Sequence, residues 1–395
     1  MSASSQTSGS LSPAALLVAP LAASYASLFA LGMTDNARGP LLGDLQRGLE
    51  LGDGGGSLLF ATTSVGVIAG SLAARRLLRR WPARRVLQVA LLVLAAGLAG
   101  TAGATGLASL LPASLCFGLG GGVLSLAQNL MVEQSAPAWL RRRAFAGLHA
   151  MYGVASLLAP LVAAAGLHLG SSWRGCLLGL AVVPLVIAAL SGLAPAAPPP
   201  RRAQAHPDGA PLGLGPWLVA LATGCCVVAE LLLSTRLPLL LEREGLSPDA
   251  AKQHLSGFFA CLLAARLFVT FVPVPLSNRR FLLLCAGAAL GLFAFGLSAA
   301  PRLLPLTALA IGPMFPVAAE LLAEEYSDRL EAALSALVAT CSVLLVAANL
   351  AVGWLCEEVS LRGALVLGPA ALGLTLALLL GGGVWERRRS DPRDR

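Results

Sequence analysis

The chain of 395 residues is 56% hydrophobic and only 12% charged, with a mean hydropathy of +0.77. A soluble globular protein has about 25% charged residues, so this composition excludes that class. The net charge of +8 could indicate a nucleic-acid partner, but the basic residues gather in short loops between apolar segments. That pattern is typical of a polytopic membrane protein.

The apolar segments are long enough to cross a bilayer, which needs about 20 residues per helix. In the first half of the sequence we expect spans at 14–43, 56–79, 84–107, 109–134, 143–168 and 173–194. In the second half we expect spans at 215–241, 252–275, 279–299, 303–325, 331–356 and 362–384. The predicted fold is an all-α membrane protein of about twelve transmembrane helices.

A polar, proline-rich stretch divides the two sets of helices. It runs from Ala196 to Pro211 and cannot span a membrane. The predicted organisation is a tail, a six-helix bundle, a linker, a second six-helix bundle and a basic tail, at residues 1–13, 14–194, 195–214, 215–384 and 385–395.

The two halves share a sequence pattern. The segment Arg38 to Asp44 returns as Arg236 to Glu242, with arginine, proline, two leucines and the acidic residue at one fixed offset, 236 − 38 = 198. An offset of half the chain indicates an internal duplication, so we expect two pseudo-symmetric bundles.

The Lys and Arg residues are distributed unevenly over the alternating loops. Nineteen lie on the side of the linker and the two termini, six lie on the opposite side, and three fall inside helices. The cytoplasmic side of a membrane protein carries the excess. Both termini are therefore predicted to be cytoplasmic, in a multi-pass protein of the cell (inner) membrane.

Ionisable residues inside the spans are the first candidates for function, because a charge at that depth is costly unless it has a task or a partner. We predict Asp35 and Glu230 as proton-coupling residues. Asp35 and Arg38 are three apart and share a helix face, with Asn36 beside them. Glu230 and Arg266 lie at similar depth on consecutive spans and can pair. The alternatives are a permanent structural pair for Glu230 and Arg266, and charges that reach the interface for Asp35 and Arg38.

Further polar residues interrupt otherwise apolar helices. With Asn36, Arg38 and Arg266, they complete the predicted substrate cavity: Gln128, Asn129, His149, Tyr152 and Glu320. His149 can change its charge near neutral pH. Hydrogen bonding between helices is the alternative role for the amides.

Motifs for other chemistry are missing from the sequence. The eight cysteines form no CxxC pair, which argues against disulfides and metal sites. The run Gly118 to Gly122 lies inside a span without a following Lys-Ser/Thr, so it favours close helix packing over phosphate binding. We expect no cofactor and no metal, a monomer, and partners limited to a small-molecule substrate, protons and lipids, with no nucleic acid.

Local motifs resemble those of the major facilitator superfamily, as do the two six-helix halves with a cytoplasmic linker. Gly70 to Arg76, continuing to Arg84 to Leu87, looks like the loop between the second and third helices of that family. Gly118 to Asn129 and Arg143 to Gly153, followed by Ala159-Pro160, resemble the fucose and glucose permease branch, which is proton-coupled. The resemblance implies a secondary transporter that works by alternating access.

The predicted function is therefore secondary active transport of a small organic solute, by proton-coupled symport, with no enzymatic activity. One alternative is a proton-antiport exporter of drugs or amphipathic metabolites. A remote alternative is an integral membrane lipid enzyme, but such enzymes cluster His, Asp and Glu at one membrane face, and here these residues are spread over depth.

Overall fold

The computed structural model describes residues 13–192, 212–272, 274–326 and 329–390. Every regular element in these ranges is helical. In the first half the helices are α1 (Pro13–Asn36), α2 (Leu42–Gly48), α3 (Asp53–Arg80), α4 (Ala83–Gly103), α5 (Leu107–Ser135), α6 (Ala138–His168) and α7 (Trp173–Ser191). In the second half they are α8 (Leu214–Arg243), α9 (Pro248–Phe271), α10 (Asn278–Ser298), η1 (Pro301–Leu306), α11 (Thr307–Ile311), α12 (Met314–Glu325), α13 (Leu330–Glu358), α14 (Leu361–Ala364) and α15 (Leu367–Ser390).

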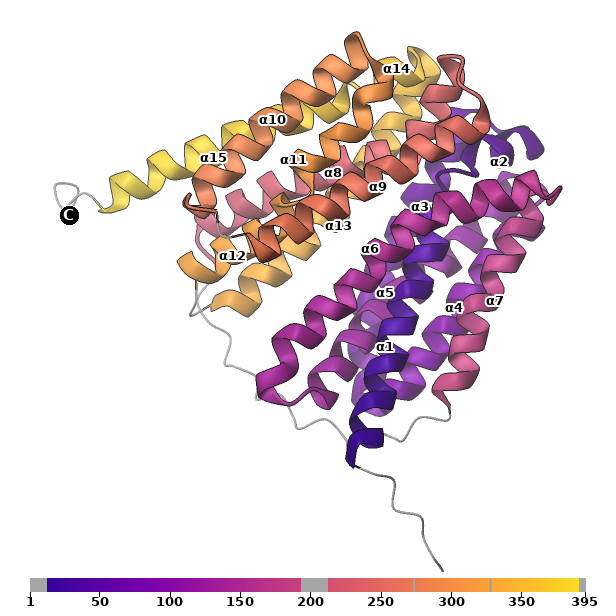
Figure 1. Cartoon of the computed structure of the whole chain (residues 1–395), viewed down its shortest axis with the longest axis horizontal. Helices are drawn as coiled ribbons and strands as arrows, with labels where there is room; N and C mark the ends of the chain where they lie inside the picture. Colours follow the sequence, from indigo (N-terminus) through magenta and orange to yellow (C-terminus); the bar gives the residue numbers. More distant parts are fainter. Residues whose placement is uncertain (1–12, 193–211, 273, 327–328, 391–395) are drawn as a thin grey trace, which may run out of the picture.

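These helices form the membrane fold that the composition predicts. Within the described ranges, 11 segments are long and apolar enough to cross a bilayer, and α1 adds a helix of 24 residues. Figure 1 shows α1 to α7 grouped beside α8 to α15, with the helices of the two groups diverging toward the end where α1 begins. The all-α, two-bundle fold is confirmed. The predicted tail 1–13 and linker 195–214 fall almost entirely outside the described residues.

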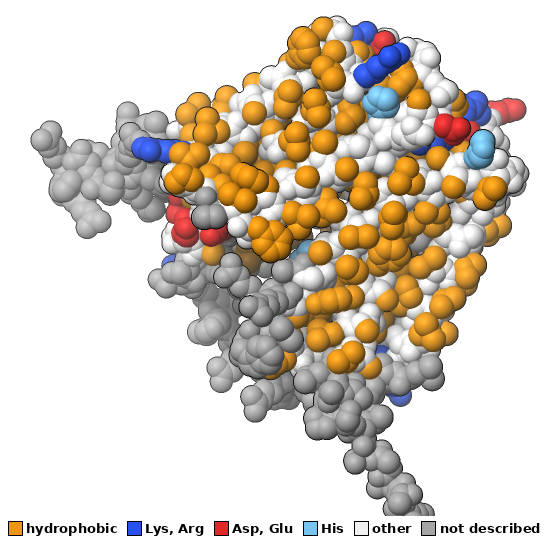
Figure 2. Space-filling view, viewed as in Figure 1, with side chains coloured by type: hydrophobic (Ala, Val, Ile, Leu, Met, Phe, Trp, Pro, Cys, Tyr) orange, Lys and Arg blue, Asp and Glu red, His pale blue; other side chains and the backbone are white. Residues whose placement is uncertain are grey.

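The lateral surface of the molecule is apolar. In the face shown in Figure 2, hydrophobic side chains cover the middle of both halves, and most charged side chains gather at the ends of the helices. A surface of this kind suits a lipid environment, because hydrocarbon cannot solvate charge.

Glycines allow α5 to pack unusually closely on its neighbours. A Cβ atom at Gly118 would lie 2.1 Å from the Thr63 carbonyl oxygen of α3, and one at Gly97 of α4 would lie 2.2 Å from the Phe117 nitrogen. Only a residue without a side chain fits such contacts, so the glycine run acts as the packing surface that the sequence predicts.

The first span is shorter than predicted. A helix over 14–43 was expected, but α1 ends at Asn36, and residues 37–41 form a turn before the short helix α2. Gly39 and Pro40 explain this end, since glycine is a poor helix former and proline lacks the backbone donor. At the equivalent position of the second half, Leu237 replaces the glycine, and α8 continues through Pro238 to Arg243.

The tenth span is also broken. A single helix over 303–325 was expected, but the segment is divided into η1, α11 and α12. Pro301 and Pro305 lie in η1, and the pair Gly312-Pro313 separates α11 from α12. The three prolines remove backbone donors from the helical ladder. The break leaves carbonyl groups near the middle of the bundle without a helical partner.

The two halves are joined at the end opposite the linker. Asp53 at the start of α3 forms two hydrogen bonds of 2.7 and 2.9 Å with Arg243 at the end of α8. Lys252 of α9, although only 1% exposed, lies 3.7 Å from the carboxylate of Asp44. Every hydrogen bond and ion pair that we find between the halves, within the described ranges, lies on this side of the central cavity. The structure is therefore closed at the end that carries α2 and α14.

Candidate functional site: a central polar cavity

A cavity of about 260 Å³ lies between the two halves. Residues of α1, α3 and α6 line it from one half, and residues of α8, α9 and α13 line it from the other. Its polar lining consists of Asp35, Asn36, Arg38, Thr63, Ser64, Tyr152, Ser156, Glu230, Ser234, Thr235, Ser342 and Asn349. Phe60, Phe259 and several aliphatic side chains supply the apolar part. Such a mixture suits a small solute that has both polar and apolar groups.

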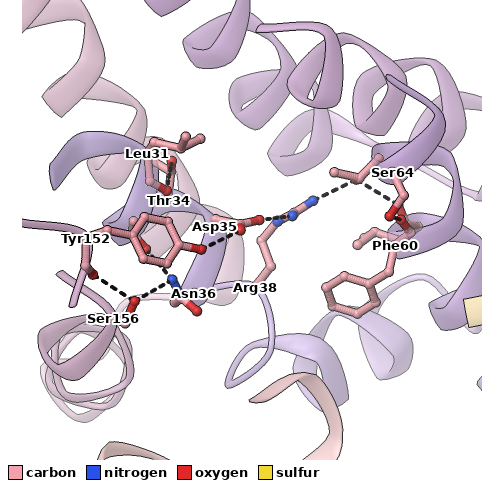
Figure 3. Close-up of polar contacts among 12 residues, drawn as sticks. Leu31, Thr34, Asp35, Asn36, Arg38, Phe60, Ser64, Tyr152 and Ser156 are labelled. Atoms are coloured by element: carbon pink, nitrogen blue, oxygen red, sulfur yellow. Dashed lines mark hydrogen bonds and ion pairs between the residues drawn. The ribbon is translucent and has the colours of Figure 1, made fainter. Parts of the chain in front are cut away.

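Asp35 is at the centre of the polar network in the first half. Its carboxylate forms an ion pair with Arg38 and accepts a hydrogen bond of 3.1 Å from the Tyr152 hydroxyl of α6. Figure 3 shows the three side chains in a row, with Asp35 in the middle. The Asp35 side chain is 36% exposed, so solvent in the cavity reaches it.

Residues of α3 and α5 hold the Arg38 side chain in place within the first half. Its side chain is 5% exposed, and its Nη1 atom donates a 2.8 Å hydrogen bond to Thr63 Oγ1. The guanidinium lies over the rings of Phe117 and Phe60, at 4.1 and 5.4 Å from their centroids. Its Nε atom is buried without a hydrogen-bond partner. This burial excludes the alternative in which Arg38 extends to the membrane interface.

Asn36 connects two helices that line the cavity, α1 and α6. Its amide donates hydrogen bonds of 2.9 Å to the Gly32 carbonyl and to Ser156 Oγ of α6. Figure 3 shows Asn36 and Ser156 on the side of Asp35 away from Arg38. The bond to Ser156 joins α1 to α6 near the point where Tyr152 reaches Asp35.

In the second half, the predicted contact between Glu230 and Arg266 is present. Arg266 Nη2 lies 3.4 Å from Glu230 Oε1, and Arg266 Nε donates a 3.2 Å hydrogen bond to the Gly312 carbonyl. That carbonyl is available because the residue four positions later, Pro316, has no N–H to bond it. Glu230 lines the cavity and is 22% exposed, whereas Arg266 is 34% exposed and is not part of the lining.

Arg236 was missed as a site residue, although the repeat pointed to it. It is 2% exposed, and it donates hydrogen bonds to Thr235, to Ser57 of the other half and to Asn349, at 2.8, 2.9 and 3.3 Å. Its guanidinium lies 5.6 Å from the Phe60 ring. The two arginines related by the repeat, Arg38 and Arg236, thus share one aromatic ring. Within the described residues, no carboxylate forms an ion pair with Arg236.

Besides Arg266, four predicted cavity residues lie outside the lining. Gln128 is buried and accepts a 3.1 Å hydrogen bond from Ser27, which joins α5 to α1. Asn129 donates to the Ser125 carbonyl of its own helix. His149 and Glu320 are exposed, on α6 and α12. Any part of these four in substrate binding stays a prediction.

Comparison with known proteins identifies the class. The sequence profile described as "Major Facilitator Superfamily" matches residues 24–344. The chain belongs to the major facilitator superfamily, and it is a membrane transporter and not an enzyme. No curated protein sequence matches the chain.

Solved structures of the same fold cover nearly the whole chain. A D-xylose-proton symporter has 15% identity and a TM-score of 0.75, with 93% of this chain and 97% of that chain covered. The xylose transporter XylE from E. coli, in an inward open conformation, has 14% identity and a TM-score of 0.74, with 92% and 94% covered. The transporter FucP, in an outward conformation, has 14% identity and a TM-score of 0.61, with 93% and 99% covered.

Proposed function

We propose that this protein is a proton-coupled symporter of a small organic solute, and that Asp35 carries the proton. The observation behind the proposal is the position of Asp35, which faces the cavity between Arg38 and the Tyr152 hydroxyl. Solvent in the cavity gives protons access to this carboxylate, and the fixed guanidinium of Arg38 is its partner in the ionised form. Alternating access exposes the carboxylate to the proton concentration of one side at a time, as proton coupling requires.

The proposed cycle uses the two halves, residues 14–194 and 215–384, as rocking bundles around the cavity. Closing the cavity to water raises the cost of an ionised Asp35, so a proton has to be bound before the halves can close over it. Once Asp35 is neutral, Arg38 loses its only charged partner in the described part of the chain. The guanidinium can then hold a polar group of the solute.

The structure corresponds to an inward-facing state in this proposal. Its inter-half contacts lie opposite the linker, and its likeness to the inward open XylE exceeds its likeness to the outward FucP, with TM-scores of 0.74 and 0.61. The linker side is the cytoplasm and the membrane is the cell (inner) membrane. The xylose transporters among the structural neighbours, together with the hydroxyl-rich lining, favour a sugar-like or otherwise polar solute.

Asp35→Asn tests the proton role. A solute is first found by its stabilisation of the purified protein, and transport is then measured in proteoliposomes. We expect the variant to lose accumulation driven by a pH gradient and to keep solute exchange, because the neutral amide imitates the protonated acid. Glu133→Gln removes an exposed carboxylate of the same half and should leave both activities intact.

Accumulation by Asp35→Asn with an unchanged pH dependence would contradict the role of Asp35. The same assay decides between symport and antiport. In a symporter, protons enter the vesicles with the solute, whereas an exporter that works by antiport moves them in the opposite direction.

A further inference from the structure

A second cavity lies on the outer surface of the first half, away from the central site. It has a volume of about 580 Å³ and lies between the start of α4 and the end of α7. Trp81, Arg85 and Gln88 form its polar end, and Val89, Leu92 and Leu185 line the rest. It shares no residue with the central cavity. We refer to it as the α4–α7 groove.

The groove crosses from the edge of the membrane into its apolar layer. Trp81 lies two residues before the start of α4 and is 43% exposed, as is usual for tryptophan at a membrane interface. Leu92 lies nine residues after Ala83, about 13 Å further along the helix. Leu92 and Leu185 are 49% and 44% exposed on the apolar surfaces of α4 and α7. The groove therefore has one end in the headgroup layer and one in hydrocarbon.

The polar end of the groove is cationic. Arg85 is exposed, and its side chain forms no hydrogen bond or ion pair with any described residue. Six arginines lie between residues 75 and 85, and no Asp or Glu occurs between Asp53 and Glu133. This stretch of the sequence therefore carries a net positive charge, which attracts a negatively charged group.

The floor of the groove is held rigid by bonds between its two helices. Gln88 Nε2 of α4 donates a 3.1 Å hydrogen bond to the Ala188 carbonyl of α7. Arg84 Nη1 lies 3.5 Å from the Gly192 carbonyl at the end of α7. A floor fixed before binding lowers the entropic cost of receiving a ligand.

We infer that the α4–α7 groove binds an anionic phospholipid. The phosphate contacts Arg85 beside Trp81, and an acyl chain lies along Val89, Leu92 and Leu185. A water-soluble anion would leave the apolar part of the groove empty. A zwitterionic lipid would bring its own ammonium group into the arginine field, so charge complementarity favours a lipid with net negative charge. This binding is independent of the transported solute.

Native mass spectrometry of the purified chain tests the inference. The protein in detergent is mixed with equal amounts of dioleoylphosphatidylglycerol and dioleoylphosphatidylcholine, and the bound lipids are counted. We expect the wild type to retain phosphatidylglycerol preferentially. Arg85→Gln should lower that preference roughly fivefold, because one arginine near the membrane surface contributes about 1 kcal/mol to the binding of anionic lipid.

Two further variants make the result decisive. Arg80→Gln removes the same charge at the end of α3, five residues before Arg85, but Arg80 does not line the groove, so the preference should persist. Leu185→Trp fills the apolar part and should reduce the binding of both lipids. Both positions are exposed, and neither change should lower the thermal stability of the protein in detergent.

An equal loss of preference in Arg80→Gln and Arg85→Gln would overturn the inference, because it would indicate diffuse attraction to a basic surface. Unchanged lipid binding in both Arg85→Gln and Leu185→Trp would overturn it as well. A dimer that Leu185→Trp abolishes would assign the groove to a second copy of the chain instead.

Discussion

Arg38 and Arg266 show two ways of keeping a guanidinium near the centre of a membrane protein. Arg38 is almost fully buried, with two aromatic rings and one carboxylate around it. Arg266 is 34% exposed and divides its bonds between Glu230 and a backbone carbonyl. The first arrangement fixes the position of the charge, and the second leaves the side chain partly exposed.

The Glu230–Arg266 pair gives a prediction at this scale. Replacing either residue alone by leucine leaves its partner as an unpaired charge in a site of low polarity, which costs stability. Replacing both residues removes this cost. Because both side chains are partly exposed, we expect each single variant to be about 1 kcal/mol less stable than the double variant. Thermal unfolding in detergent measures the difference. If the loss of stability in the double variant equalled the sum of the losses in the two single variants, this view of the pair would be contradicted.

Spacing and depth in the sequence were enough to predict some of these contacts. The Asp35–Arg38 pair follows from a separation of three residues, and the Glu230–Arg266 pair follows from equal depth on consecutive spans. The Tyr152–Asp35 bond and the burial of Arg236 could not be predicted. They depend on which faces of distant helices meet, and hydrophobic periodicity does not contain that information.

At the level of elements, the contact between α3 and α5 depends on glycine. Gly118→Ala would place a methyl group 2.1 Å from the Thr63 carbonyl oxygen, so the helices would have to separate. We expect a loss of about 1–3 kcal/mol in stability, the usual cost of overpacking. Thermal unfolding of the purified variant checks the value.

The matched control is Gly179→Ala in α7, where an added Cβ meets no atom within 4 Å. Since alanine is the better helix former, this change should leave stability unchanged or raise it by up to about 1 kcal/mol. If Gly118→Ala were as stable as Gly179→Ala, the glycine contact would not limit how closely α3 and α5 pack.

The positions of the spans were predictable from the sequence, but the breaks within them were not. Hydropathy averages over many residues, so it places a span but not an interruption of a few residues. Gly312-Pro313 and Gly39-Pro40 end helices here, whereas Pro238 lies inside α8 without ending it. A proline within a membrane helix is tolerated when neighbouring helices or side chains satisfy the freed groups, and that condition is known only from the packed structure.

For the whole molecule, the repeat and the hydropathy of the sequence together predict two bundles, and the structure has them. The closed end of the molecule was not predicted. Lys252 and Arg243 contact Asp44 and Asp53 across the two halves, and no sequence pattern indicates these pairs. Which residues meet at such an end depends on the conformational state, and one sequence encodes more than one state.

The burial of Arg236 also connects the protein to the electrical potential of the membrane. Its charge has no ion-pair partner in the described chain, and one of its hydrogen bonds, to Ser57, crosses between the halves at the closed end. If that end opens in the cycle, the guanidinium passes from inside the barrier to outside water. Moving one charge through the whole field is worth about 2.3 kcal/mol per 100 mV. Movement of the Arg236 charge through a third of the field would therefore change the population ratio of the two states about fourfold at 100 mV.

A negative potential on the linker side holds this positive charge inward and therefore favours the state seen here. We expect solute transport in proteoliposomes to depend on a potential imposed with potassium and valinomycin, and Arg236→Gln to weaken that dependence. The same voltage dependence in both proteins would show that Arg236 does not move through the field. If the dependence weakens, the second arginine of the repeat makes the membrane voltage, in addition to the proton gradient, a determinant of which side the cavity faces.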